Sequence, residues 1–310
     1  MESLNRTALE LVDEAIDFAD ELNVTVHASD ETATVLDFGV AVPGGVEAGL
    51  MLAEIQTGGL ATVQSGMGEV AGAPLTHVEV STDHPALALL AGQKAGWEVS
   101  VDGFEGLGSG PARALVAREE EFARIGYEDD FEFAVLALEA EELPGDAVAE
   151  HVAETAGVTT SSVFLPTYRA ASVTGSVVGA ARAAEMTTFR LSELGYDPLD
   201  VLSVSASAPV APVADAEATA IARTADAVAY GGRVHLVVDA DFDRFAEITS
   251  TAHADHGTPL GAAFDDVDWD FQELSPSVFG PAQVTVDVVG GPTTVYGDVH
   301  EDVLAESFQL

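Results

Sequence analysis

The stretch AASVTGSVVGAARAAEMTTF (residues 170–189) is the most informative part of the sequence. Almost every side chain in it is small or apolar, so at helical spacing it predicts a helix that is apolar around most of its circumference. That pattern is typical of a helix buried inside a folded protein. Only Arg182 and Glu185 carry a charge within this stretch.

These two residues are three positions apart, so they project from one helix face and can form an ion pair. One interpretation is an ordinary surface salt bridge, worth about 1 kcal/mol at most. We favour a functional pair, because charged residues are almost never fully buried unless they are paired or functional. A half-buried carboxylate beside a guanidinium is a tunable general base, since burial raises the pKa of a carboxylate and the guanidinium lowers it.

Strand-like and helical segments alternate on both sides of this stretch, which predicts an α/β (α+β) protein. The apolar periodicity predicts helices over residues 5–22, 44–58, 111–125, 147–155, 171–194 and 216–229. Strands are predicted over residues 24–27, 34–40, 60–64, 77–80, 97–101, 133–138, 162–165, 201–205, 234–238 and 284–288.

The length of 310 residues predicts two domains, since single hydrophobic cores stop growing at about 250 to 300 residues. The acidic stretch 119–130 between two apolar runs is the best candidate for the boundary. We therefore expect an N-terminal α/β domain over residues 1–125 and a C-terminal α/β domain over residues 126–310. In one variant of this division the C-terminal strands return to the first domain.

Acidic residues outnumber basic ones by 53 to 11, which gives a formal net charge of -42. This charge argues against nucleic acid and anionic membranes as partners, because those partners need clusters of Lys and Arg. The carboxylates are spread along the chain, as expected for a halophilic protein whose self-repulsion is screened by salt. A surface made for one basic partner is the less favoured reading.

The chain has no cysteine, so thiolate metal sites and a Cys nucleophile are excluded. The N-terminus shows neither a signal peptide nor an apolar span, and we expect a cytoplasmic protein. His253, Asp255 and His256 could bind a metal, but a convincing further ligand is missing, and we predict no metal. The serines form no nucleophile elbow with a plausible triad order, and no dinucleotide fingerprint follows a strand.

Two further segments carry candidate binding residues. GLGSGPARAL (residues 106–115) has glycines for a tight turn, Pro111 for the first helical position, and Arg113 beside the free N–H groups of a helix start, which together favour an anion. The residues alone slightly favour a plain strand-to-helix turn instead, because short glycine-rich turns are common. Lys94, the single lysine in the sequence, follows an apolar helix, although an exposed loop lysine would explain it equally well.

Six segments together resemble the methenyltetrahydromethanopterin cyclohydrolase family, in the family's order and over nearly the whole chain. They are AGLMLAEIQTGGL (48–60), AGQKAGWEV (91–99), GSGPARAL (108–115), AASVTGSVVGAARAAEM (170–186), RTADAVAYGG (223–232) and SPSVFGPAQVTV (275–286). The resemblance implies a two-domain α/β subunit with its pocket between the domains, assembled as a homotrimer. It also implies hydrolysis of a methenyl-tetrahydromethanopterin cation to a formyl derivative, without metal or nucleotide cofactor.

In the family the Arg-x-x-Glu pair of the buried helix is catalytic, and it corresponds to Arg182 and Glu185 here. By the same resemblance the pterin and its tail are lined by a set of residues from the other segments, namely Glu54, Lys94, Ser109, Gly110, Pro111 and Arg113. The run 167–172, with Tyr168 and Arg169, departs from the small uncharged residues expected there. The alternatives are a methenyltetrahydrofolate cyclohydrolase with the same residues and a non-catalytic pterin-binding protein.

Overall fold

A computed structural model describes residues 3–28, 32–252, 256–267, 269, 274 and 276–310. The described residues divide into two compact units, each with its own sheet, which confirms the α/β class. Unit 1 comprises the described residues of Met1–Thr62 and Leu87–Val178, and unit 2 comprises those of Val63–Ala86 and Gly179–Leu310. Within the described part of the chain, no helix is both long and apolar enough to cross a membrane.

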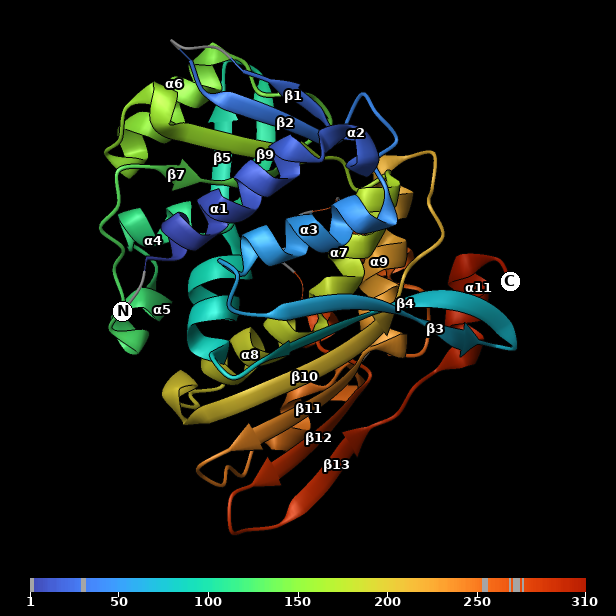
Figure 1. Ribbon diagram of the computed structural model, residues 1–310. Coiled ribbons are helices and arrows are strands. Elements are labelled where there is room, and N and C mark those ends of the chain that lie inside the picture. The colour runs from blue at the N-terminus through green and yellow to red at the C-terminus, as the bar shows by residue number, and fades with distance from the viewer. Residues whose placement is uncertain (1–2, 29–31, 253–255, 268, 270–273, 275) are drawn as a thin grey trace. The chain divides into compact units, whose positions relative to one another are not determined.

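Unit 1 is built on a seven-stranded sheet (Figure 1). Its strands are β1 (Thr25–His27), β2 (Thr34–Gly39), β5 (Ala95–Val101), β6 (Phe104–Ser109), β7 (Ala134–Val135), β8 (Ala137–Glu139) and β9 (Val163–Tyr168). The strand order is β1-β2-β9-β8-β6-β5, with β7 also paired to β9. The pairs of β9 with β2, β7 and β8 are parallel, whereas β5 and β6 form an antiparallel hairpin.

Helices cover both faces of this sheet. The side chains of residues 135–138 point alternately to one face and the other, and each face packs against different helices. Val135 and Ala137 pack among apolar residues of α1, α3 and α7, while Leu136 and Leu138 pack on the opposite side with α6. The helices of unit 1 are α1 (Leu4–Asp17), α2 (Ala19–Leu22), α3 (Val46–Gln56), α4 (Ala112–Val116), α5 (Glu120–Ile125), α6 (Asp146–Ala156) and most of α7 (Val173–Ala181).

Unit 2 holds a six-stranded sheet with the order β13-β12-β11-β10-β4-β3. Its strands are β3 (Thr62–Val70), β4 (Ala73–Thr82), β10 (Val201–Pro209), β11 (Arg233–Val238), β12 (Gln283–Val288) and β13 (Thr293–Gly297). Its longer helices are α8 (Ala183–Glu193), α9 (Glu217–Gly231), α10 (Leu260–Asp266) and α11 (Glu301–Phe308). Helices α8 and α9 pack against β10, whose alternate residues Val204, Ala206 and Ala208 are buried.

The boundary predicted between residues 125 and 126 falls inside unit 1. Strands on both sides of it pair in one sheet, since β9 lies beside β2 with Leu36 opposite Pro166. The C-terminal strands β12 and β13 lie in the sheet of unit 2, together with the earlier hairpin β3–β4. The grouping therefore follows strand pairing between distant parts of the chain, which local composition does not encode.

Three local predictions also differ from the structure. The segment 106–109 is the end of strand β6 rather than a turn, and only Gly110, with a φ of 107°, makes the turn. The helix predicted over residues 111–125 is broken at Ala117, which adopts a left-handed φ of 46°. Strand β13 was not predicted, because its alternation of Thr, Val and Tyr is short and bounded by glycines.

Asp226 ties three helices of unit 2 together. Its side chain is buried, and its two oxygens accept hydrogen bonds from the backbone N–H of Leu260 (2.8 Å) and from Ser307 Oγ (2.6 Å). Burial raises the pKa of Asp226 from 3.8 to about 6, although both hydrogen bonds act to lower it. Because the folded state then binds the proton more tightly than the unfolded state, this group costs stability as the pH rises from 3.8 to about 6.

Replacing Asp226 by Asn should remove that cost, since the uncharged amide oxygen can still accept from the Leu260 N–H and the amide NH2 can donate to Ser307 Oγ. We expect Asp226→Asn to gain on the order of 3 kcal/mol over the native chain at pH 8 and little at pH 4. Thermal unfolding at a fixed high salt concentration across this pH range measures the difference. The exposed Asp215 provides a matched control, and Asp215→Asn should show no such pH dependence. An equal gain at both pH values for Asp226→Asn would contradict the assignment.

Candidate active site

The predicted pair Arg182 and Glu185 lies in unit 2, at the break between helices α7 and α8. The chain is helical through Ala181 in α7 and again from Ala183 in α8, and Arg182 forms the break between them. At this break the Arg182 N–H donates to the carbonyl of Gly179, three residues back, so one turn is tightened. The predicted buried helix is thus present, as two helices with Arg182 at the joint.

The two side chains form the ion pair that the sequence predicted. Arg182 Nε and Nη2 lie 3.0 Å and 2.9 Å from the same oxygen, Glu185 Oε2. The Glu185 side chain is 3% exposed and that of Arg182 is 20% exposed, so this is not an ordinary surface salt bridge. Among the described residues no hydrogen bond reaches Glu185 Oε1, which leaves that oxygen available to a water or a ligand. A fixed carboxylate with one engaged and one available oxygen can act as a general base.

In unit 1, the predicted Ser109-Gly110-Pro111 turn lies at the end of strand β6. The Gly110 N–H donates to the carbonyl of Gly92 (2.9 Å), which joins this turn to the π-helix Ala86–Gln93. Gly92 itself lies against helix α3, since a Cβ there would be 2.7 Å from the Gln56 carbonyl oxygen. The segments 48–60, 91–99 and 108–115, which are far apart in sequence, are therefore brought together.

Gln56 belongs to this cluster, although the sequence reasoning did not single it out. Its side chain is buried, and its Nε2 donates to Ser109 Oγ over 2.8 Å. Its Oε1 has no hydrogen-bond partner among the described residues. Gln56 lies in the quoted AEIQTGG segment, and its polar character near the end of an apolar helix was the available signal.

The predicted binding residues Lys94 and Arg113 meet on one carboxylate, Glu119. Lys94 Nζ lies 2.6 Å from Glu119 Oε2 and 3.3 Å from Glu121 Oε1. Arg113 makes a bidentate contact with Glu119, with Nε to Oε1 at 2.8 Å and Nη2 to Oε2 at 2.7 Å. Burial acts to raise the pKa of Glu119, but the hydrogen bonds and charges of Arg113 and Lys94 hold that pKa below its usual value.

This geometry makes Arg113 a structural cation, in place of the anion-binding role that we predicted. The residue is 1% exposed, and its Nη1 donates to the carbonyls of Leu90 (3.1 Å) and Gly92 (3.2 Å). Its charge is neutralised by Glu119, and its guanidinium lies over the ring of Phe122. The sequence showed a rare cation beside a helix start but not the carboxylate six residues later that engages it.

The remaining predictions concern Glu54 and the histidine loop. Glu54 is half-buried on α3, where its carbonyl accepts hydrogen bonds from Thr57 Oγ1 and from the N–H of Gly59. A role for its carboxylate stays a prediction. His253 and Asp255, which entered the metal alternative with His256, lie outside the described residues.

Comparison with known proteins identifies the family. The family model described as Cyclohydrolase (MCH) matches residues 3–308. A methenyltetrahydromethanopterin cyclohydrolase of Halobacterium salinarum is 60% identical over 310 residues, covering 100% of both chains. Proteins with the same name from Methanocella arvoryzae and Methanocaldococcus jannaschii are 39% and 38% identical, over 99% of this chain and 98% of each relative. The chain therefore belongs to the cyclohydrolase (MCH) family, as its motifs predicted.

Proposed function

We propose that this protein hydrolyses 5,10-methenyl-tetrahydromethanopterin to the formyl derivative. The observation that carries the proposal is the Arg182–Glu185 pair, a buried carboxylate fixed through one oxygen by a neighbouring guanidinium. Support comes from the relatives of this chain, which are named methenyltetrahydromethanopterin cyclohydrolases and are similar over nearly its whole length.

In the proposed reaction Glu185 activates the water. The bridging carbon of the substrate is part of a cationic amidinium, which is electrophilic without a Lewis acid. Glu185 Oε1 takes a proton from water as the water oxygen bonds to that carbon. The carbon–nitrogen bond then breaks, and Glu185 returns the proton to the departing ring nitrogen. The second water proton leaves to solvent, because the cationic substrate becomes a neutral formyl product.

Arg182 is proposed to act through Glu185. Its two contacts to Oε2 hold the carboxylate in one orientation, and its positive charge favours the ionised form. A fixed orientation matters because a base must lie within hydrogen-bond reach of the proton that it removes. The two residues would therefore function as a unit.

We further propose that the unit 1 cluster contacts the pterin carrier. Ser109 accepts a hydrogen bond from Gln56, so the Ser109 hydroxyl hydrogen can be donated elsewhere. The backbone of Gly110 and Pro111 directly follows Ser109. Lys94 comes directly after the π-helix Ala86–Gln93, to which this turn is hydrogen-bonded. Glu54 is proposed to pair with the aminopyrimidinone edge of the pterin, a geometry that suits carboxylates.

The setting of the enzyme is also proposed. The net charge of -42 is consistent with work in a salt-rich cytoplasm. The family resemblance supports a homotrimer that uses no metal or nucleotide cofactor.

Turnover with both carriers at high salt tests the proposal. Loss of the methenyl absorption should be rapid with the tetrahydromethanopterin substrate and at least about tenfold lower in kcat/KM with the tetrahydrofolate analogue, since the carriers differ where the protein binds them. Faster turnover of the folate compound would identify the alternative carrier. Binding without turnover of either compound would instead indicate a pterin-binding protein without catalysis.

A further inference from the structure

The buried amide of Gln56 in unit 1 carries a hydrogen-bonding atom that the fold does not use. Gln56 is the last residue of helix α3 and is 2% exposed. Its Nε2 donates to Ser109 Oγ, whereas its Oε1 has no hydrogen-bond partner among the described residues. A buried acceptor without a partner loses its water without compensation, which destabilises the folded state. An apolar side chain of similar size would avoid that penalty, so stability does not explain the amide.

The backbone around this amide fixes its position relative to Ser109. Gly92 of the π-helix packs directly against the Gln56 carbonyl, and the same Gly92 accepts a hydrogen bond from the Gly110 N–H. Ser109 precedes Gly110 and lies between strands β5 and β8, with which β6 pairs at this position. The two side chains therefore extend from backbone segments that are themselves joined, and the hydrogen bond between them has a fixed direction.

The Ser109 hydroxyl is the group on which Gln56 acts. Ser109 is 4% exposed, and no described residue accepts a hydrogen bond from its Oγ. A hydroxyl has one hydrogen to donate and two lone pairs that accept, and the Gln56 amide occupies an accepting position. The hydroxyl hydrogen must then point away from the amide NH2. Ser109 is thus a donor of defined direction whose acceptor lies outside the described residues.

We infer that Gln56 is a positioning residue, which aims the Ser109 hydroxyl hydrogen at an acceptor atom of the reduced pterin carrier. The inference rests on the proposed function, in which Ser109 contacts that carrier. A reduced pterin offers a ring carbonyl oxygen and ring nitrogens as acceptors. A hydroxyl that is already oriented binds such an atom without losing rotational freedom, which favours binding. The cost of the unpaired Gln56 Oε1 is then the price of an oriented donor.

Paired substitutions test the inference through affinity, at a fixed high salt concentration. The dissociation constant of tetrahydromethanopterin should rise by about three- to tenfold in Gln56→Met, and similarly in Ser109→Ala. The double variant should bind no more weakly than Ser109→Ala alone, because Gln56 acts through that hydroxyl. With the methenyl substrate, KM should follow the same pattern while kcat stays within about twofold of the native value, since Gln56 contacts no reacting atom.

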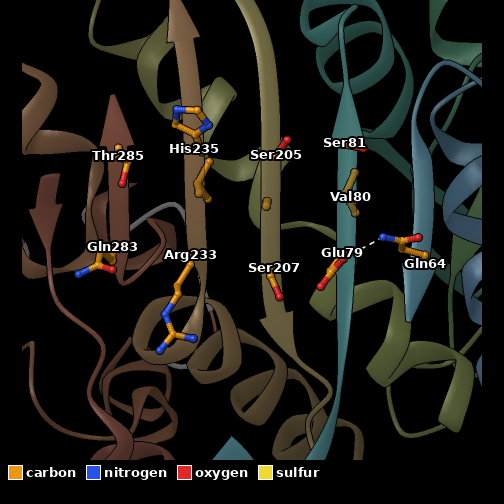
Figure 2. Close-up of a pocket in the computed structure, with 12 residues that line it drawn as sticks. Gln64, Glu79, Val80, Ser81, Ser205, Ser207, Arg233, His235, Gln283 and Thr285 are labelled. Atoms are coloured by element: carbon orange, nitrogen blue, oxygen red, sulfur yellow. Dashed lines mark hydrogen bonds between the residues drawn. The ribbon is translucent and has the colours of Figure 1, made fainter. Parts of the chain in front are cut away.

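Thermal unfolding gives the readout that separates positioning from a structural role. The double variant removes both hydrogen-bonding partners and leaves no unpaired buried acceptor, so its Tm should equal or exceed that of the native chain. Gln64→Met in unit 2 is the matched control. Figure 2 shows the Gln64 amide bonded to Glu79 at the side of a groove of about 430 Å³, with Nε2 and Oε2 2.8 Å apart. This control should leave the dissociation constant at its native value.

Two results would overturn the inference. One is native affinity in Gln56→Met, or effects of the two substitutions that multiply in the double variant. The other is a double variant whose Tm lies clearly below that of the native chain, which would make the amide structural. Failure of the proposed function is distinguishable, because the native chain itself would then not hydrolyse the methenyl substrate. If the native chain bound the carrier without hydrolysis, the dissociation constants would still test Gln56.

Discussion

Replacing Glu185 by Gln is expected to lower kcat by about 10²- to 10⁴-fold while KM changes little. The amide has nearly the same shape, and its oxygen can still accept from Arg182, so the helix joint should keep its structure. What is lost is the ability to take a proton from water. Single-turnover loss of the methenyl absorption at saturating substrate measures the chemical step directly.

A matched control lies on the same helix. Glu193 pairs with Arg190 at the same three-residue spacing, but its side chain is 33% exposed, compared with 3% for Glu185. Glu193→Gln should leave kcat unchanged. Arg182→Lys should lower kcat less than Glu185→Gln, because an ammonium keeps the charge but not the two contacts to Oε2. Near-normal turnover by Glu185→Gln would refute the catalytic role.

Removing the Glu119 carboxylate is expected to be the most destabilising of the charge deletions considered. Arg113 is 1% exposed, so Glu119→Ala would leave a buried guanidinium without its counter-charge, at a cost of about 3 to 5 kcal/mol. Denaturant unfolding at constant salt measures the change. The lowered pKa of Glu119 adds a pH dependence in the native chain, because the stability it contributes is lost as the pH falls through the folded pKa.

Two comparisons separate this explanation from a general loss of charge. Glu247→Ala removes one partner of the exposed Arg244–Glu247 pair, whose side chains are 44% and 46% exposed, and should change stability far less than Glu119→Ala does. Replacing Arg113 and Glu119 together by Met and Leu should recover part of the loss, since the buried guanidinium is removed and Lys94 keeps Glu121 as its partner. A small effect of Glu119→Ala would show that water reaches Arg113 in solution.

The sequence contained enough to predict the family, the α/β class and the ion pair. Residues 170–189 are so uniformly small and apolar that the burial of Glu185 follows from the pattern alone. The break at Arg182 was not predictable, because it depends on one tightened turn within an otherwise helical pattern.

The errors share a physical cause, since they depend on which distant residue reaches a side chain. In the sequence Arg113 is a cation beside a helix start, as an anion ligand would be. Only the structure shows that the Glu119 carboxylate pairs with it. Residues 106–109 have the composition of a glycine turn, and they extend only because β5 and β8 pair on either side of β6. Gln56 belongs to the cluster because it donates a hydrogen bond to Ser109, which lies 53 positions away in the chain.

The pairing of β4 with β10 also has a consequence for how the chain folds. Ser81 is opposite Ser205, so the hairpin β3–β4 meets its neighbour only after another 124 residues have been added. At about 5 to 20 residues per second this amounts to roughly 6 to 25 seconds on the ribosome. During that time one edge of β4 is open to pairing with other nascent chains, and the charges of Glu69 and Glu79 are well placed to keep the waiting hairpin from aggregating.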